Sequence, residues 1–158
     1  MGARLDYERL LIEAANIVAE ELRFDVRLKK VCKLLATTIS YYNWVGFYIA
    51  DPVRRELLLG PYVGTPTDHI RVAYGRGICG QAAERERTFV VQDVTTETSY
   101  IPCNMHVRSE IVVPVFRDGS VVAEIDVDSL TIFAFSNDDK LFLESLADRV
   151  APIIQTEA

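Results

Sequence analysis

Hydrophobic and polar positions follow two different periods along the chain, and these periods predict its elements. Before Tyr41, apolar side chains recur three and four positions apart, as they do on one face of a helix. From Tyr41 onward, aromatic and β-branched residues dominate, which favours strands. The first half of the chain is therefore predicted to contain helices at 10–22 and 26–39, a hairpin of strands at 44–50 and 57–62, a strand at 70–74, a helix at 80–87 and a strand at 89–91.

The second half of the chain carries a strong hairpin signal followed by a helix. Asp118-Gly119 lies between apolar runs at 111–116 and 121–129, which predicts a tight turn between antiparallel strands. Residues 93–108 show little periodicity and are expected to form a long loop. Ser136 is expected to cap a closing helix. The apolar stripe of this helix is predicted to consist of Leu141, Phe142, Leu146, Val150 and Ile153.

This order of elements predicts an α+β fold. Hairpins require antiparallel pairing, so the strands are expected to form one central antiparallel sheet. The N- and C-terminal helices would pack on one face of that sheet and leave the other face free for a ligand pocket. Since no repeat, linker or change of composition divides residues 1–158, we expect a single domain.

Composition and charge narrow the class of protein. The chain is 49% hydrophobic and 25% charged, which is typical of a globular protein and excludes collagenous, low-complexity and disordered classes. Its net charge of −6 argues against nucleic-acid and anionic membrane partners. There is no signal peptide and no apolar run long enough to span a bilayer, so a cytoplasmic location is expected. Three cysteines, an odd number, argue against a secreted disulfide framework.

A glycine-rich segment, GRGICG at 75–80, matches the G-x-G-x-x-G pattern of dinucleotide-binding proteins. Such a site needs repeated parallel βαβ units, which this sequence does not predict. Two interpretations remain. The segment is either a turn that presents backbone N–H groups at a helix N-terminus, which would favour an anion and a Cys79 thiolate, or a structural turn around a buried cysteine.

The strand at 121–129 holds a cluster of carboxyl groups. Glu124, Asp126 and Asp128 alternate with apolar residues and should face the same side of the sheet, with Glu110 on the partner strand as a further member. A solvated sheet face would explain this alternation, but this face is also the expected pocket wall. In a pocket, such a cluster could bind a metal or an ammonium group, or act as an acid.

The cysteines and histidines differ in their surroundings. Cys32 lies on the apolar side of a predicted helix and is interpreted as structural, whereas Cys103 lies in the polar loop. His69 and His106 could form a metal site with Asp126, Asp128 and Glu110. Because no His-x-x-x-His or Cys-x-x-Cys spacing supports such a site, we predict no metal.

Seven short blocks follow one another along the chain: NWVGFY (43–48), LGPY (59–62), GRGICG (75–80), DV (93–94), IPC (101–103), SEIVVPV (109–115) and IDVDS (125–129). In order and spacing, they resemble the free methionine-(R)-sulfoxide reductases of the GAF-domain type over nearly the whole chain. The resemblance implies a single GAF domain, often dimeric, with a closed pocket for free methionine sulfoxide. It also implies thioredoxin as the reductant and no cofactor.

The resemblance also assigns residues. It implies Cys103 as the nucleophile and Cys79 as a second redox cysteine. The pocket it implies is formed by Trp44, Tyr48, Glu110, Asp126 and Asp128. Many relatives carry a further cysteine at the position of His69, so here the disulfide partner of Cys103 would be Cys79 or an external thiol.

These residues suggest a thiol-dependent reduction. The Cys103 thiolate would attack the sulfoxide sulfur while Asp126, Asp128 or Glu110 protonates the leaving oxygen. The remaining carboxylates would hold the substrate ammonium, and Trp44 would pack on the S-methyl group. The alternative is a non-catalytic GAF domain that binds or senses a small molecule.

Overall fold

The computed structural model describes residues 5–97 and 106–156. Its elements, in chain order, are α1 (Tyr7–Val18), α2 (Phe24–Thr38), β1 (Trp44–Asp51), β2 (Glu56–Val63), β3 (Arg71–Ala73), α3 (Gly77–Arg85), β4 (Phe89–Val91), the 3₁₀ turn η1 (Val94–Thr96), β5 (Ser109–Arg117), β6 (Ser120–Ser129), α4 (Asn137–Val150) and the 3₁₀ turn η2 (Ala151–Ile153).

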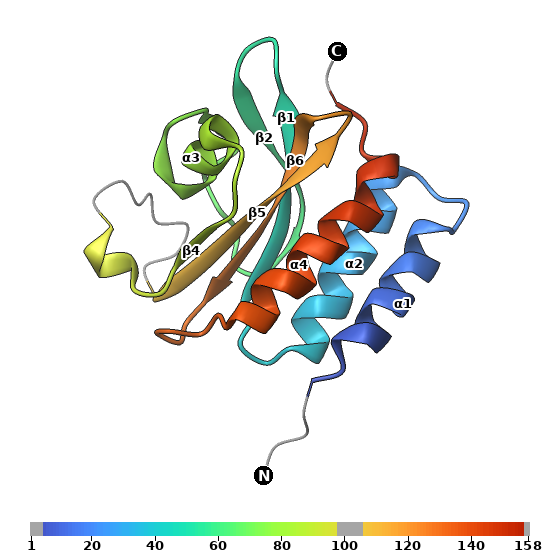
Figure 1. Cartoon of the computed structure of the whole chain (residues 1–158), viewed down its shortest axis with the longest axis horizontal. Helices are drawn as coiled ribbons and strands as arrows, with labels where there is room; N and C mark the ends of the chain where they lie inside the picture. The colour runs from blue at the N-terminus through green and yellow to red at the C-terminus, as the bar shows by residue number, and fades with distance from the viewer. Residues whose placement is uncertain (1–4, 98–105, 157–158) are drawn as a thin grey trace.

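The strands of the described residues form one six-stranded antiparallel sheet in the order β3-β2-β1-β6-β5-β4 (Figure 1). Both predicted hairpins, β1/β2 and β5/β6, are confirmed. Pairing of β1 with β6 joins the two hairpins, so these strands lie at the centre of the sheet. The central strands β1 and β6 are buried along almost their whole length.

Helices cover the two faces of the sheet unequally. α1, α2 and α4 lie together on one face, and α3 lies on the other (Figure 1). Under the helix layer is an apolar core that includes Leu28, Phe47, Ile111, Ile125 and Leu146. This arrangement confirms the predicted α+β architecture with the terminal helices on one face. We call the opposite face, toward α3, the pocket face.

Two helices differ in extent from their prediction for local reasons. α1 begins at Tyr7 because the Asp6 side chain caps it, accepting a hydrogen bond from the Arg9 N–H at 3.0 Å. It ends at Val18, so Leu22 lies outside the helix and is exposed. α3 begins at Gly77 instead of residue 80, which places Cys79 in its first turn.

The closing helix α4 is capped as predicted. The Ser136 side chain accepts a hydrogen bond from the backbone of Asp139, whose carboxylate accepts one from the Ser136 N–H. Phe142 is buried as expected, but the prediction for Leu141 is wrong, because its side chain is 54% exposed. The helix ends at Val150, and Ile153 belongs to the 3₁₀ turn that follows.

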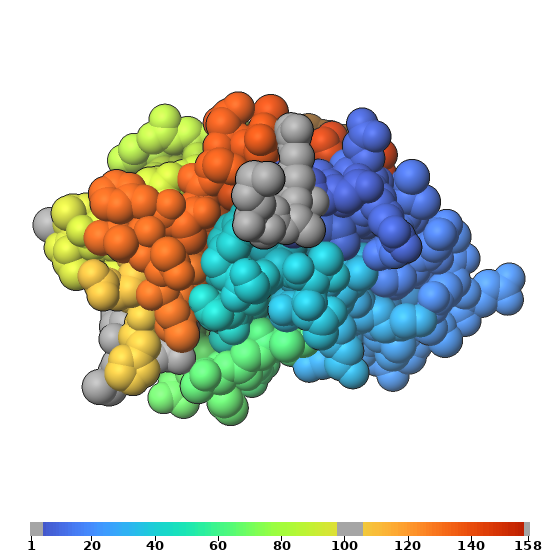
Figure 2. Space-filling model, turned by 90° about the horizontal axis from the view of Figure 1, so that it is seen from below, coloured from blue at the N-terminus to red at the C-terminus, as the bar shows by residue number. Residues whose placement is uncertain are grey.

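The chain between α2 and β1 is fixed against the segment after β6. Figure 2 shows this cyan part of the chain beside the orange segment around residue 130. Here the Leu130 N–H donates a hydrogen bond to the Asn43 side-chain oxygen at 2.8 Å. No helix within residues 5–97 and 106–156 has the length and apolar character needed to cross a membrane.

Candidate active site

The carboxyl groups of β6 face the same side of the sheet, as predicted. Ala123, Ile125 and Val127 belong to the core under the helix layer, so the residues between them point toward the pocket face. On that face, antiparallel pairing sets Glu124, Asp126 and Asp128 opposite side chains of β1 and β5. The paired positions are Tyr48–Glu124–Pro114, Gly46–Asp126–Val112 and Trp44–Asp128–Glu110.

These carboxyl groups are buried, not solvated. Glu124 and Asp126 are each 0% exposed, Asp128 is 1% exposed, and Glu110 is 3% exposed. The interpretation of β6 as a strand with a solvated polar face is therefore wrong. Burying several carboxyl groups side by side is costly, which makes this cluster a functional candidate.

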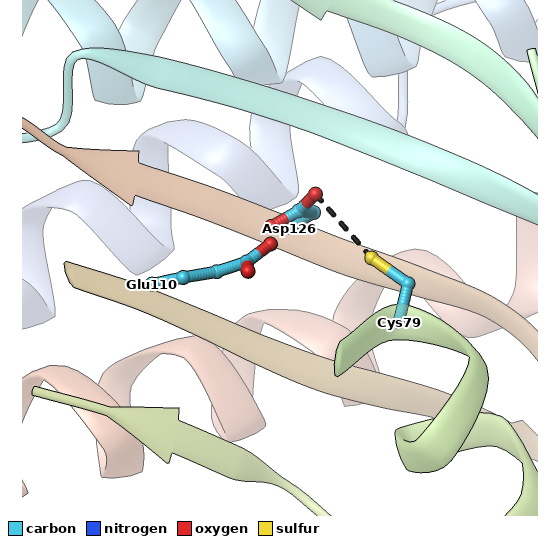
Figure 3. A group of neighbouring side chains, drawn as sticks. All are labelled: Cys79, Glu110 and Asp126. Carbon is cyan, nitrogen blue, oxygen red and sulfur yellow. Dashed lines mark hydrogen bonds between the residues drawn. The ribbon is translucent and has the colours of Figure 1, made fainter. Parts of the chain in front are cut away.

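Helix α3 brings a thiol onto this cluster. Cys79 lies in the first turn of α3, and its Sγ donates a hydrogen bond to Asp126 Oδ2 at 3.4 Å (Figure 3). Glu110 approaches the same place from β5. One ligand atom from each of Cys79, Glu110 and Asp126 lies within 4.8 Å of the others. Three segments that are distant in the sequence thus converge on one point.

Burial controls the protonation of the cluster. It raises the pKa of Glu124 well above its usual range, and the neighbouring charge of Asp126 raises it further. Burial and the Asp126 charge likewise raise the pKa of Asp128. Burial also raises the pKa of Asp126, although hydrogen bonds with Glu110 and Cys79 oppose the shift. Burial therefore favours the protonated form of these carboxyl groups.

Aromatic side chains line the pocket beside Asp126. The Trp44 indole stacks on Tyr62 with ring centroids 5.2 Å apart, and its Nε1 donates a hydrogen bond to the Thr65 carbonyl at 3.0 Å. A Cβ atom on Gly46 would lie 2.4 Å from Trp44 Cη2, so the indole extends over Gly46. Gly46 is the residue of β1 that is paired with Asp126 of β6 and, on its other side, with Tyr62 of β2.

Tyr48 ties the pocket to the segment before β3. It is 1% exposed, and its hydroxyl donates a hydrogen bond to the His69 carbonyl at 3.0 Å. The His69 imidazole is near enough to Asp126 to lower the pKa of that carboxyl group. His69 also lines a small hollow of about 120 Å³ together with Arg71 and Arg76.

A larger hollow, of about 950 Å³, lies elsewhere, between the start of α1 and the α2–β1 connection. It is lined by Tyr7, Tyr41 and Asp138 among others and contains none of the pocket-face carboxyl groups. Its size alone does not make it the reactive site, because no titratable group with an unsatisfied oxygen faces it within the described part of the chain.

The predicted site residues Trp44, Tyr48, Cys79, Glu110, Asp126 and Asp128 all belong to the pocket side of the sheet. Cys103, the predicted nucleophile, lies outside the described residues.

Cys32 is buried in α2, as expected for a structural residue, and its thiol donates a hydrogen bond to the Pro61 carbonyl at 3.7 Å. Among the described residues, the side chains close enough together to hold a metal are Cys79, Glu110 and Asp126. The set considered from the sequence had His69 and His106 in place of Cys79.

Sequence reasoning left three members of this pocket out of the predicted site. Glu124 carried a usable signal, because it alternates in phase with Asp126 and Asp128. Gly46 and Tyr62 lie within the blocks NWVGFY and LGPY, but these blocks gave neither residue a role. Their places beside Trp44 depend on strand register, which includes an irregularity in β1 between Gly46 and Tyr48.

Comparison with known proteins was consistent with this geometry. The family model described as GAF domain matches residues 10–154. A free methionine-R-sulfoxide reductase of Saccharomyces cerevisiae is 36% identical over 145 residues, covering 90% of this chain and 78% of that protein.

Two solved structures are also closely similar. The free methionine-R-sulfoxide reductase of Neisseria meningitidis, in complex with its substrate, superposes with a TM-score of 0.89 at 34% identity, covering 98% of this chain and 93% of that one. The substrate complex of fRMsr of Staphylococcus aureus has a TM-score of 0.87 at 32% identity, covering 98% and 99%.

Proposed function

The chain belongs to the GAF domain family and, within it, to the free methionine-R-sulfoxide reductases, and we propose that it reduces free L-methionine-(R)-sulfoxide to methionine with cysteine thiols. The observation that carries this proposal is the Cys79 thiol hydrogen-bonded to Asp126 within a buried cluster of carboxyl groups. Substrate complexes of the relatives support the choice of substrate. The similarity extends over residues 10–154, which supports one domain spanning the chain.

The buried carboxyl groups are suited to a free amino acid. A desolvated ammonium group needs compensating negative charge, which Glu110, Asp126 and Asp128 can supply. A methionine sulfoxide within a polypeptide has no free ammonium group to offer. Trp44 would contact the S-methyl group, because sulfur packs favourably against aromatic rings, and Tyr48 would close the pocket toward His69.

The reducing step transfers oxygen from the substrate to Cys103. Its thiolate attacks the sulfoxide sulfur while Asp126, Asp128 or Glu110 donates a proton to the leaving oxygen. This attack forms an S–S bond between Cys103 and the substrate as the S–O bond breaks. The released hydroxide then attacks the Cys103 sulfur, and the electron pair of the S–S bond passes to the substrate sulfur, so that methionine leaves and Cys103 is oxidised to a sulfenic acid. A carboxyl group with a raised pKa suits this role because it still carries its proton near neutrality.

The resolving step regenerates the thiol. Cys79, or else an external thiol, attacks the Cys103 sulfenic acid, so that an S–S bond forms and the hydroxyl leaves as water with the proton of the attacking thiol. The hydrogen bond to Asp126 supports Cys79, because the carboxylate can accept that proton. A dithiol such as thioredoxin then reduces the disulfide. From the resemblance, we also propose a homodimer, and we propose a cytoplasmic location and thiol chemistry that needs no cofactor.

Thiol titration tests this function against the alternative of a ligand sensor. The reduced protein, which has 3 cysteines, is incubated with free L-methionine-(R)-sulfoxide and its thiols are counted. The enzyme loses the thiols of Cys79 and Cys103 and forms methionine, whereas a sensor binds the ligand and keeps all of its thiols. Substantial methionine production by the Cys103→Ser variant would reject Cys103 as the nucleophile.

The role of Cys79 is tested separately. If Cys79 resolves the oxidised nucleophile, Cys79→Ser should accumulate the sulfenic acid after one turnover and lose recycling by thioredoxin. A wild-type steady-state rate in this variant would indicate direct attack by an external thiol instead.

A further inference from the structure

The group formed by Cys79, Glu110 and Asp126 has the composition of a metal site. A thiol and two carboxyl groups from α3, β5 and β6 converge, with one ligand atom of each within 4.8 Å of the others (Figure 3). Cys79, Glu110 and Asp126 are 9%, 3% and 0% exposed, respectively. Thiolate, carboxylate and water are common ligands of Zn²⁺.

The charge of the pocket face gives a second, independent reason to expect a cation. Asp126 Oδ1 and both carboxyl oxygens of Asp128 are buried and make no hydrogen bond of ordinary distance and angle, although Glu110 lies near enough to both groups to lower their pKa values. In the described part of the chain, the buried charged side chains are all acidic. Buried carboxylates require a positive partner, and no buried lysine or arginine among those residues provides one.

We propose that, in the absence of substrate, the pocket binds one Zn²⁺ ion through Cys79 Sγ and the carboxylates of Glu110 and Asp126. Tetrahedral zinc with a Zn–S bond of about 2.3 Å and a Zn–O bond of about 2.1 Å separates sulfur and oxygen ligands by about 3.6 Å. Cys79 Sγ and Asp126 Oδ2 are already 3.4 Å apart. Asp128, with its two unbonded oxygens, or a water molecule would occupy the fourth position.

Metal and substrate then exclude one another. On binding, the Cys79 S–H bond breaks, its proton leaves to solvent and an S–Zn bond forms, with no change of oxidation state. The ion occupies the carboxylates that the proposed function assigns to the substrate ammonium, so this consequence depends on that function. Zn²⁺ would act as a reversible competitive inhibitor and would protect the Cys79 thiol while bound.

The metal site is tested with Co²⁺ as a spectroscopic probe. Titration of the reduced, metal-free protein should produce a thiolate-to-cobalt charge-transfer band at a stoichiometry of one, and one equivalent of Zn²⁺ should remove it. Cys79→Ser should abolish the band and Asp126→Asn should weaken binding at least about tenfold. Two variants serve as matched controls and should retain the band: Cys32→Ala removes a buried thiol on the helix side, and Glu124→Gln removes a carboxyl group of the same strand outside the ligand group.

A measurement on the unsubstituted protein guards against misfolded variants. Zn²⁺ should slow alkylation of Cys79 by iodoacetamide, as measured by mass spectrometry, and should leave the reaction of the unfolded protein unchanged. Absence of a charge-transfer band, a band that survives in Cys79→Ser, or unprotected Cys79 would each overturn the metal site.

Competition between metal and substrate tests the metal site and the proposed substrate site independently of each other. Free L-methionine-(R)-sulfoxide added to the cobalt-loaded Cys103→Ser variant should displace the metal without turnover. A metal that binds at Cys79 but is not displaced would retain the metal site and overturn the placement of the substrate on the same carboxylates.

Discussion

At the scale of single residues, Gly46 determines how far the Trp44 ring extends over the pocket. An added Cβ would lie 2.4 Å from Trp44 Cη2 and 2.8 Å from Tyr62 Cβ, closer than atoms in contact can approach. Gly46→Ala should therefore displace the indole and destabilise the protein by about 1–3 kcal/mol, as overpacking does. We expect KM for free methionine sulfoxide to rise more than kcat falls. An unchanged KM in steady-state kinetics would show that Trp44 does not contact the substrate.

Asp126 should matter much more for activity than for stability. Asp126→Asn keeps the shape of the side chain but removes its ionisable proton and its negative charge beside Cys79, so kcat/KM should fall by about 10²–10⁴-fold. The free energy of unfolding at neutral pH should stay equal or rise, because burial disfavours the charged carboxylate. Kinetics and urea unfolding measure the two effects. Asp118→Asn, at an exposed carboxyl group in the turn between β5 and β6, is the control and should keep its activity.

At the scale of elements, the start of α4 is held by one carboxylate. Asp139 is 0% exposed, and its Oδ1 accepts hydrogen bonds from the hydroxyls of Tyr7, Tyr41 and Tyr42 at 3.1, 2.8 and 2.7 Å. Its Oδ2 accepts from the Ser136 N–H at 2.8 Å. One residue thus ties α1 and the α2–β1 connection to the cap of α4.

Removing this carboxylate should be costly. Asp139→Ala leaves three phenol donors and the helix cap without their acceptor, so the free energy of unfolding should fall by about 3 kcal/mol or more. Asp138→Ala, in the same turn but exposed, is the matched control and should change it by about 0.5 kcal/mol or less. Urea unfolding of both variants measures the difference. Equal effects would mean that the tyrosine contacts contribute little.

The elements show where sequence patterns are sufficient. The strands of both hairpins were predicted to within two residues, because alternation of apolar side chains and the Asp118-Gly119 turn are local signals. Helix ends were less accurate. α3 starts at Gly77, earlier than predicted, and the left-handed φ of 63° with which Gly77 turns the chain into the helix is not revealed by a pattern of apolar residues. Leu141 was misplaced because helical spacing predicts a stripe but not its width.

Predicting the contacts within the candidate site requires more than local sequence patterns. Alternation along β6 was enough to place Asp126 and Asp128 on one face, the hairpin partner strand suggested Glu110, and the glycine-rich turn suggested Cys79, to which the resemblance added a redox role. The contact between Cys79 and Asp126 depends on how α3 crosses β6, a tertiary packing that no spacing in the sequence expresses. The same holds for Tyr62, which stacks on Trp44 only because of the register between β1 and β2.

At the scale of the whole molecule, the buried carboxyl groups link stability to pH. Unfolded, Glu124, Asp126 and Asp128 have ordinary pKa values near 4, whereas burial raises the pKa of each in the fold. The folded protein therefore holds more protons than the unfolded chain above that pH. The stability contributed by these groups is complete below the unfolded pKa and is lost as the pH rises through the folded pKa.

This linkage gives a measurable slope. In a chelating buffer that keeps the protein metal-free, the free energy of unfolding should fall between about pH 5 and about pH 8, by up to about 1.4 kcal/mol per pH unit for each carboxyl group that stays protonated. Glu124→Gln removes one such group, so its slope should be shallower by about that amount. Asp51 and Asp93, whose hydrogen bonds lower their pKa values, are common to both proteins, so their contributions cancel in the comparison. If the free energy of unfolding falls with the same slope in the unsubstituted protein and in Glu124→Gln, Glu124 ionises in the fold. The pocket face would then tolerate buried negative charge without a proton, a metal or a substrate ammonium to balance it.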